Sequence, residues 1–241
     1  MPRRKENFAN EEVYHLVTRA IDDNIIFKDT NDHYRGIYSI YEFNTTKAVV
    51  IRDRRSARSR IKKTLKKLNK DPRLATDSRD KLVEILAFCI MPNHLHLLVR
   101  QLKDGGISKF MAKSGGGYGG YFNRKYHRKG YVFRDNFKAV PVKNDEQLKV
   151  VWAYIHANPV SLIEPKWKER GVRNFKKAIQ FLENYKWSSY RDYIRGDNFP
   201  SVTERKFILD VMGGVTQSKE FLKDHIKYKA EIKDFPELTL E

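Results

Sequence analysis

The chain has 241 residues, with 48 lysines and arginines against 30 aspartates and glutamates, which gives a formal net charge of +18 at pH 7. A hydrophobic fraction of 40% is typical of a folded protein with one good core, and the excess of positive charge predicts a polyanionic partner, nucleic acid before an anionic membrane surface. The longest apolar run, residues 85–91, is too short to cross a bilayer, and no signal peptide is recognisable. The single cysteine, Cys89, excludes an internal disulfide and indicates a reducing, cytoplasmic location.

The first third of the chain predicts a strand, a helix and a basic segment. Residues 12–20 alternate well enough for a strand on which His15 and Arg19 share a face. Residues 31–43 predict a helix packed by aromatic side chains. Residues 52–70 hold ten basic residues and one acidic residue, and they are interpreted as a basic amphipathic helix or a mobile insertion. Such a charge run can also be only a solvated face.

A hairpin follows the basic segment. Residues 83–91 (VEILAFCIM) predict a buried strand, and Pro92 and Asn93 mark a tight turn into a second strand. On that strand His94 and His96 lie two positions apart, so both imidazoles share one face and the leucines between and after them share the other. The hairpin places the histidine pair near the centre of the sheet.

The second half of the chain contains a glycine-rich segment and a segment with clear helical periodicity. Residues 114–120 (SGGGYGG) predict a flexible or kinked segment, because they lack the Gly-Lys-Ser/Thr ending of a phosphate-binding loop. Residues 143–158 predict a helix that begins with a capping box at Asn144 and Gln147 and ends before Pro159. Its apolar stripe consists of Leu148, Val151, Trp152 and Ile155.

The histidine pair and the 143–158 helix together indicate phosphodiester chemistry. Two imidazoles on one strand suit a divalent metal and leave positions open for a third side chain, water and substrate. A tyrosine oxygen can attack a phosphodiester to form a covalent phosphotyrosine, and Tyr154 lies one turn from Asn158 on the same helix face. A metal on His94 and His96 would neutralise charge on the phosphate, and the Asn158 carbonyl oxygen can be a third ligand. This donor set suits Mg²⁺ or Mn²⁺.

Each of these residues also has a purely structural interpretation. The histidines can form the polar face of a half-buried strand, and Tyr154 can be one of 13 tyrosines that pack in a core. His127 and His156 are interpreted as non-catalytic; His156 is two positions from Tyr154 and therefore on another face of the helix.

Five stretches carry a family resemblance, in matching order and spacing. They are MPNHLHLLV at 91–99, YFNRKY at 121–126, GYVFRDNFKA at 130–139, YIHANPV at 154–160 and WSSY at 187–190. The first and fourth are the specific ones. Through them the chain resembles the REP-associated tyrosine transposases, relatives of the single-tyrosine transposases of bacterial insertion sequences, over roughly residues 10–195.

The resemblance implies a fold and a role for each site residue. The implied fold is an α+β, ferredoxin-like sandwich whose central antiparallel sheet carries the His-x-His strand, followed by a helical C-terminal extension. The family's metal ligands correspond to His94 and His96, with Asn158 at the position of the third ligand. The nucleophile on single-stranded DNA corresponds to Tyr154. The known substrates are hairpins flanked by single-stranded guide sequences.

The same resemblance divides the chain and marks two departures. Residues 1–195 are predicted to form the transposase domain, and residues 196–241 a basic helical extension. The basic insertion at 44–82 is longer than in compact relatives. The glycine-rich segment 114–120 falls where relatives look more helical.

A DNA-binding groove is predicted where cations and aromatics interleave after the glycine-rich segment. Such a groove can pair with phosphates and stack bases of a single strand. The candidate residues are Tyr121, Arg124, Lys125, Arg128, Arg134 and Lys138.

Three functions are compatible with these patterns. The leading one is a metal-dependent single-stranded DNA endonuclease and strand transferase that forms a 5′-phosphotyrosine on Tyr154. A non-catalytic nucleic-acid-binding protein derived from such an enzyme is the main alternative, and a water-using metal hydrolase is the third. For the leading function we expect a cytoplasmic, nucleoid-associated monomer or homodimer with hairpin or single-stranded DNA as partner and no membrane contact.

Overall fold

Four strands form one antiparallel sheet in the computed structural model, which describes residues 8–67, 77, 79–134 and 136–228. The strands β1 (Val13–Arg19), β2 (Val83–Met91), β3 (His94–Gln101) and β4 (Lys138–Val142) lie in the order β2-β3-β1-β4. Helix α1 (Thr30–Glu42) follows β1, and helix α3 (Gly106–Lys125) follows β3. This βαββαβ succession and the antiparallel pairing confirm the predicted α+β, ferredoxin-like fold.

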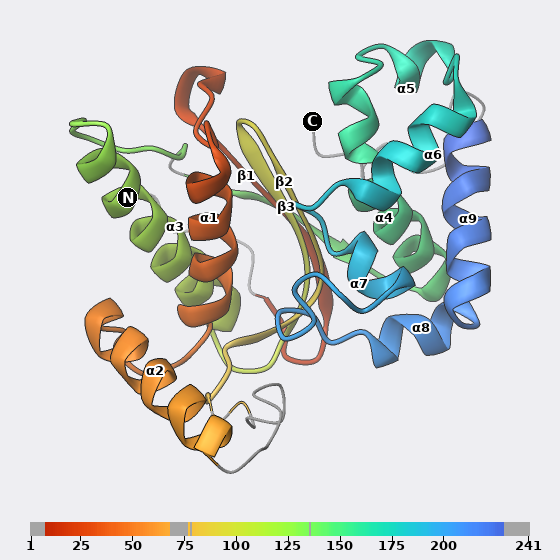
Figure 1. The fold of residues 1–241 in the computed structure, drawn as a ribbon. Coiled ribbons are helices and arrows are strands. Elements are labelled where there is room, and N and C mark those ends of the chain that lie inside the picture. Colours follow the sequence, from red (N-terminus) through yellow and green to blue (C-terminus); the bar gives the residue numbers. More distant parts are fainter. Residues whose placement is uncertain (1–7, 68–76, 78, 135, 229–241) are drawn as a thin grey trace.

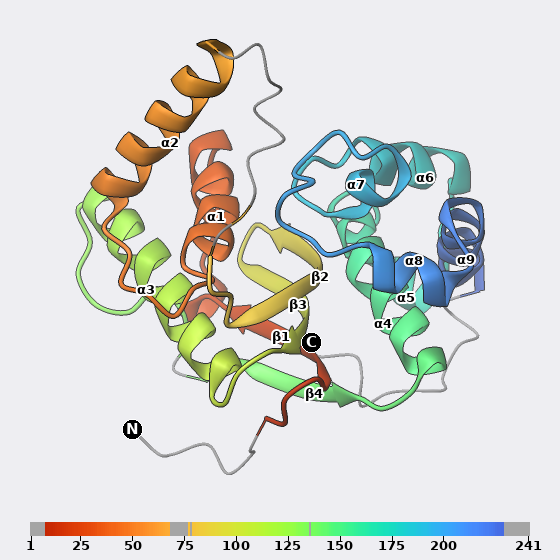
Figure 2. The same cartoon turned by 90° about the horizontal axis from the view of Figure 1, so that it is seen from below.

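Helices cover both faces of the sheet. Helices α1 and α3 lie on one face, while α4 (Asp145–Ala157) and the helices after it lie on the other (Figure 1). The same layering is visible from below (Figure 2). The remaining elements are η1 (Ile21–Asp23), η3 (Asn158–Leu162), α5 (Trp167–Arg170), α6 (Phe175–Asn184), α7 (Tyr190–Ile194), α8 (Lys206–Met212) and α9 (Val215–Tyr228).

The predicted hairpin is confirmed, and it sets which residues face which layer. Because side chains alternate along a strand, Leu95 and Leu97 join the core under α1 and α3, whereas Leu98 joins the core under α4. His94 and His96 therefore face the α4 layer. Strand β3 lies between β2 and β1, so the histidines stand on a central strand.

The predicted helix at residues 31–43 forms as α1, but its buried face is mainly aliphatic. Ile37 and Ile40 are 5% and 1% exposed, whereas Tyr34 is 43% exposed. The helix begins at Asp29, whose side chain accepts a hydrogen bond from the backbone N–H of Asp32. The aromatic side chains lie at the edges of the α1 contact rather than at its centre.

The prediction of a flexible or kinked segment at residues 114–120 is wrong, because these residues lie within the continuous helix α3. A Cβ atom on Gly117 would stand 2.2 Å from Phe43 Cε2, so glycine is required for the close approach of α3 to the end of α1. Arg35 adds a hydrogen bond from Nη2 to the Gly117 carbonyl oxygen at 2.9 Å. Tertiary contact thus overrides the low helix propensity of glycine.

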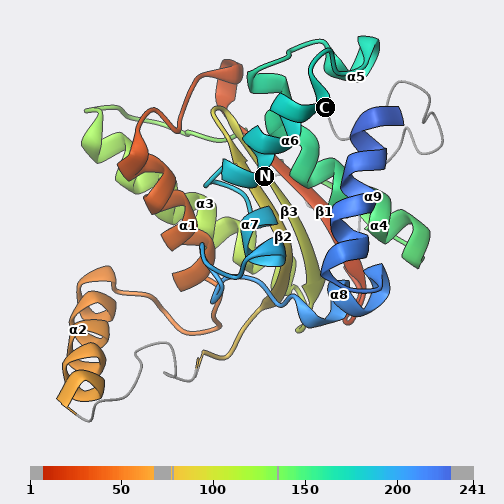
Figure 3. The ribbon, with the colours of Figure 1, turned by 45° about the vertical axis from the view of Figure 1, so that its right-hand side comes forward.

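The basic segment is helical where it is described. Helix α2 (Ile51–Lys67) stands away from the rest of the molecule (Figure 3). Residues 68–76 and 78 of the predicted insertion, and residues 229–241 of the predicted extension, lie outside the described residues. No helix in the described part of the chain is long and apolar enough to cross a membrane.

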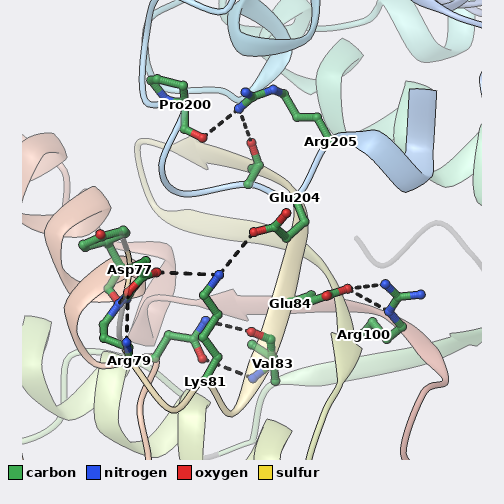
Figure 4. A network of polar contacts seen from close by, with 12 residues as sticks. Asp77, Arg79, Lys81, Val83, Glu84, Arg100, Pro200, Glu204 and Arg205 are labelled. Carbon is green, nitrogen blue, oxygen red and sulfur yellow. Dashed lines mark hydrogen bonds and ion pairs between the residues drawn. The ribbon is translucent and has the colours of Figure 1, made fainter. Parts of the chain in front are cut away.

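The C-terminal segments complete the core and cover the edge of β2. The backbone N–H of Ile90 donates to the carbonyl oxygen of Trp187, and Ser188 forms a bridge with Cys89. Lys81 Nζ lies 3.2 Å from Glu204 Oε1, and the two residues join the start of β2 to the segment before α8 (Figure 4). Fully buried side chains of α9 pack beside α4: Leu222 and Ile226.

Candidate active site

The candidate site begins with three histidines on one face of the sheet. Strand pairing places His96 opposite Val17 and Leu98 opposite His15, so His15 is the diagonal neighbour of His96 on the same face. The two rings stack with centroids 5.4 Å apart. His96 Nδ1 lies 3.1 Å from His15 Nε2, and both side chains are fully buried.

Helix α4 brings the tyrosine and the carboxamide to these histidines. The helix begins at Asn144, whose side chain accepts from the Gln147 N–H at 2.9 Å, and the predicted capping position is confirmed. At the other end Asn158 Nδ2 lies 3.3 Å from His96 Nε2. The Tyr154 ring is 3% exposed, and its centroid is 5.7 Å from the centroids of His96 and His15. All of these residues come from one chain.

Lys168, which no sequence pattern predicts as a site residue, also reaches the site. Its Nζ donates to Asn158 Oδ1 at 2.9 Å and lies 4.7 Å from the centre of the Tyr154 ring. It comes from α5, where the neighbouring Trp167 is 1% exposed and anchors the short helix in the core. No motif marks this lysine in a chain with 48 basic residues. Its role depends on a tertiary contact.

Proton positions in the site follow from which atoms can only donate or only accept. An ammonium group has no acceptor, so Asn158 Oδ1 faces Lys168 and Nδ2 must donate to His96 Nε2. His96 then carries its proton on Nδ1 and donates it to His15 Nε2. His94 donates from Nδ1 to Asn93 Oδ1 at 2.6 Å, so its lone pair is also on Nε2.

Electrostatics keep His96 neutral. Burial lowers the pKa of His96 well below its usual range, and Coulombic interactions with His94, His15 and Lys168 lower it further. A neutral imidazole with its lone pair on Nε2 is the form that binds a metal ion.

The chemistry of the donor set fits a divalent metal. Two imidazole nitrogens and one carboxamide oxygen can bind a divalent metal ion and leave coordination positions open. His15 and Asn93 would act as the outer hydrogen-bond partners that fix the tautomers of His96 and His94. Across the described residues no group of three or more His, Cys, Asp or Glu side chains is placed to hold an ion, so Asn158 would have to complete the set.

Two of the predicted DNA-binding residues are engaged within the protein. Lys125 Nζ lies 2.6 Å from Asp29 Oδ2 and 2.6 Å from Asp32 Oδ1, and the Tyr121 hydroxyl donates to Asp32 at 3.0 Å. Burial raises the pKa of Asp32, but hydrogen bonds from Lys125 and Tyr126 lower it to a net downward shift. These contacts join the end of α3 to the start of α1.

The other four predicted DNA-binding residues are exposed. Arg134 pairs with Asp23 at 3.1 Å, and both side chains are about half exposed. Lys138 lies opposite Val17 on β4, and Val17 lies opposite His96, so Lys138 stands on the histidine face of the sheet. Arg124 and Arg128 are exposed at the end of α3 and just beyond it.

His156 is separated from this site by its own contacts. It is fully buried on another side of α4, where Nε2 lies 2.8 Å from Ser189 Oγ of the WSSY stretch. Burial lowers its pKa to about 3.

Comparison with known proteins places the chain in a family. Residues 39–158, which include the histidine pair, Tyr154 and Asn158, match the model of the IS200-like transposases. The protein belongs to the IS200-like transposase family. A solved structure of a REP-associated tyrosine transposase bound to a REP hairpin is similar at 13% identity, over 85% of this chain and 92% of that chain, with a TM-score of 0.44. No curated protein matches the chain.

Proposed function

We propose that this protein is a single-stranded DNA endonuclease and strand transferase of the REP-associated type, with Tyr154 as its nucleophile. The observation that supports this is the meeting of Tyr154, Asn158 and His96 in one chain, with Asn158 Nδ2 3.3 Å from His96 Nε2 and the Tyr154 ring 5.7 Å from the His96 ring. The proposal includes a divalent metal, Mg²⁺ or Mn²⁺, held by His94, His96 and Asn158.

The proposed reaction exchanges one phosphorus–oxygen bond for another. The Tyr154 phenol gives up its proton, its oxygen bonds to the phosphorus of the scissile phosphate, and the bond from phosphorus to the 3′ oxygen breaks. The 3′ oxygen takes up a proton and leaves as a hydroxyl, while the 5′-phosphate stays on the tyrosine. A second 3′-hydroxyl reverses the step, so strand transfer requires no external energy source. When bound, the metal supplies Lewis-acid stabilisation of charge on the phosphate oxygens.

The side chains of the site hold the reacting groups in place. Helix α4 fixes Tyr154 and Asn158 one turn apart, and the His15–His96 hydrogen bond fixes the ring whose Nε2 faces Asn158. Because Tyr154 is 3% exposed, a phosphate reaches its oxygen only after residues over the ring move.

The proposed substrate is a DNA hairpin with flanking single strands, as the family resemblance implies. Exposed cations on the sheet edge, at the end of α3 and just beyond it would contact its phosphates, and affinity would come from many such contacts. The proposed contact residues are Arg124, Arg128, Arg134 and Lys138, with Lys125 and Tyr121 available only if their bonds to Asp32 break.

A covalent-trapping experiment tests the proposal. Hairpin DNAs labelled at the 5′ or 3′ end are incubated with Mg²⁺ or Mn²⁺ and the wild type, Tyr154→Phe or Tyr228→Phe, then run on a denaturing gel. Tyr228 is exposed at the end of α9 and serves as the matched control. We expect a protein–DNA band for wild type and Tyr228→Phe, and none for Tyr154→Phe.

Other outcomes select another function. Cleavage that survives in Tyr154→Phe indicates a metal hydrolase that uses water. Binding without cleavage over a broad hairpin set indicates the non-catalytic nucleic-acid-binding protein. His94→Ala with His96→Ala should abolish cleavage and keep most DNA affinity, since affinity rests on distributed phosphate contacts; equal loss of both contradicts that division of roles.

A further inference from the structure

Lys168 contacts two residues of the candidate site, but it lies outside β3 and α4, the two elements that carry the motifs of the site. Its Nζ donates to Asn158 Oδ1 at 2.9 Å and lies 4.7 Å from the Tyr154 ring centre. The lysine is therefore a candidate for a cation that acts within the site.

The lysine determines how the Asn158 amide is turned. Because an ammonium group can only donate, it holds Oδ1 toward itself, and the amide nitrogen is left facing His96 Nε2 at 3.3 Å. The Asn158 N–H group then covers the lone pair of His96. One contact at Lys168 thus sets the direction of the hydrogen bonds through Asn158 and His96.

The two atoms held in this way are the two that a metal would need. The proposed metal site takes Oδ1 of Asn158 and Nε2 of His96, and here one accepts from Lys168 and the other from the amide. A metal ion and an ammonium group repel each other strongly where water is largely excluded, and His96 and Asn158 are 0% and 1% exposed. Metal and lysine therefore cannot both use Asn158 Oδ1 without cost.

We propose that Lys168 is a further residue of the active site and that its ammonium group competes with the divalent metal for Asn158 Oδ1. A metal bound at Asn158 Oδ1 would displace the lysine, whose contact otherwise holds the Asn158 amide with Nδ2 toward His96. This inference rests on the metal site of the proposed function, and it adds a residue outside the residues 39–158 that match the family model.

Metal binding without DNA tests the competition. Mn²⁺ is titrated into full-length wild type, Lys168→Met, Lys168→Arg and Lys166→Met, and free Mn²⁺ is followed by electron paramagnetic resonance. Lys166 is the matched control because it is exposed in the same segment. Mn²⁺ binding to the wild type must break the charge-assisted hydrogen bond from Lys168, and such a bond changes a binding constant by a factor of about ten. We therefore expect Lys168→Met to bind Mn²⁺ about tenfold more tightly. Lys168→Arg and Lys166→Met should bind like wild type.

Further variants separate failure of this inference from failure of the proposed function. His94→Ala should weaken Mn²⁺ binding if the metal site is correct. If it does so while Lys168→Met binds Mn²⁺ no more tightly than wild type, the competition is overturned and the metal site stands. If neither wild type nor Lys168→Met binds Mn²⁺, both are overturned. Lys168→Gln, with circular dichroism as a check of folding, replaces Lys168→Met if that variant does not fold.

Discussion

Single residues in the candidate site are positioned by hydrogen bonds whose donors can be assigned. His15 has no assigned role in the motifs, yet it accepts the Nδ1 proton of His96 and is fully buried beside it. The sequence showed that His15 faces the same way as Arg19, but not that this face meets His96. The strand register was needed for that. His15 is a positioning residue for His96, because it fixes the ring that would hold the metal.

Replacing His15 should weaken metal binding more than folding. His15→Ala removes the acceptor for His96 Nδ1, and loss of such a partner costs roughly 10- to 100-fold in metal affinity. His15→Gln offers a carbonyl oxygen and should recover part of the affinity. Mn²⁺ titration of both variants, with thermal unfolding as a control, checks this. Equal affinities for both variants would show that hydrogen bonding to His96 is not the cause.

The pH dependence of stability should be steep on the acidic side because of His156. Burial lowers its pKa to about 3, so between pH 6.5 and 3 the unfolded chain binds a proton that the folded chain excludes. The contribution of His156 to the free energy of unfolding should therefore be largest above about pH 6.5. It should fall as pH drops, at most by about 1.4 kcal/mol per pH unit for this residue. Burial of His96 acts in the same direction.

Urea unfolding of wild type and His156→Gln between pH 7 and 4 measures this slope. The glutamine keeps a polar group near Ser189 but does not titrate. We expect a shallower decline of the unfolding free energy in the variant, whatever its absolute stability. Parallel curves for the two proteins would contradict the assignment to His156.

At the scale of elements, the periodic segments were predictable and the glycine-rich one was not. Strand β2 is a continuous apolar run, β3 begins with alternating residues and α4 has helical spacing, each with clear ends, so local pattern fixes them. Helix α3 contains five glycines among residues 114–120, and its continuity depends on packing against α1. Rules based on local sequence cannot predict that contact.

Adjacent glycines in α3 should respond in opposite directions to alanine. At Gly117 the new Cβ would lie 2.2 Å from Phe43, so Gly117→Ala should lower the free energy of unfolding by about 1–3 kcal/mol. At Gly116 nothing lies within 4 Å, so Gly116→Ala should raise it by up to about 1 kcal/mol.

Chemical denaturation of the two variants gives the comparison, and the combined variant Gly117→Ala with Phe43→Leu supplies a further check. If the clash with Phe43 is the cause, the loss in the double variant is smaller than the sum of the single losses. Stabilisation by alanine at both glycines would show that α3 does not need a glycine against α1.

At the scale of the whole molecule, positive charge is distributed unevenly. The segment 52–70 carries ten basic residues, and helix α2, which covers most of it, stands away from the body of the protein (Figure 3). A protruding basic helix can bind phosphates that lie beyond the active site. It can equally be a solvated arm, and the salt dependence of DNA binding distinguishes the two possibilities.

Removing residues 52–70 should flatten the salt dependence of DNA binding if the segment touches phosphates. The slope of log affinity against log salt should decrease in magnitude by about 0.7 for each phosphate that the segment neutralises on single strands, or about 0.9 on a duplex stem. Fluorescence anisotropy over a range of salt concentrations measures it. A chain with the ten basic residues replaced by glutamine controls for length, and unchanged slopes in both variants make the segment a solvated appendage.

The sequence alone determined the strongly periodic elements and the local geometry of the motifs. Alternation puts His94 and His96 on one face of a strand, and helical spacing puts Tyr154 and Asn158 on one face of a helix, because both patterns depend only on backbone period. The tertiary structure decided which faces meet. The contacts from His96 to Asn158 and to His15 join residues 62 and 81 positions apart, and only strand register and helix packing bring them together.

The same reason explains why Lys168 was not predicted. It is one of 48 basic residues, without a motif or period to distinguish it, and its place beside Asn158 follows from how α5 packs after η3. Residue types and the periodicity of strands and helices can be determined from the sequence, whereas the partner of a buried polar atom is fixed by three-dimensional packing. The candidate site residues could therefore be identified from their motifs, whereas the hydrogen bonds among them follow only from the fold.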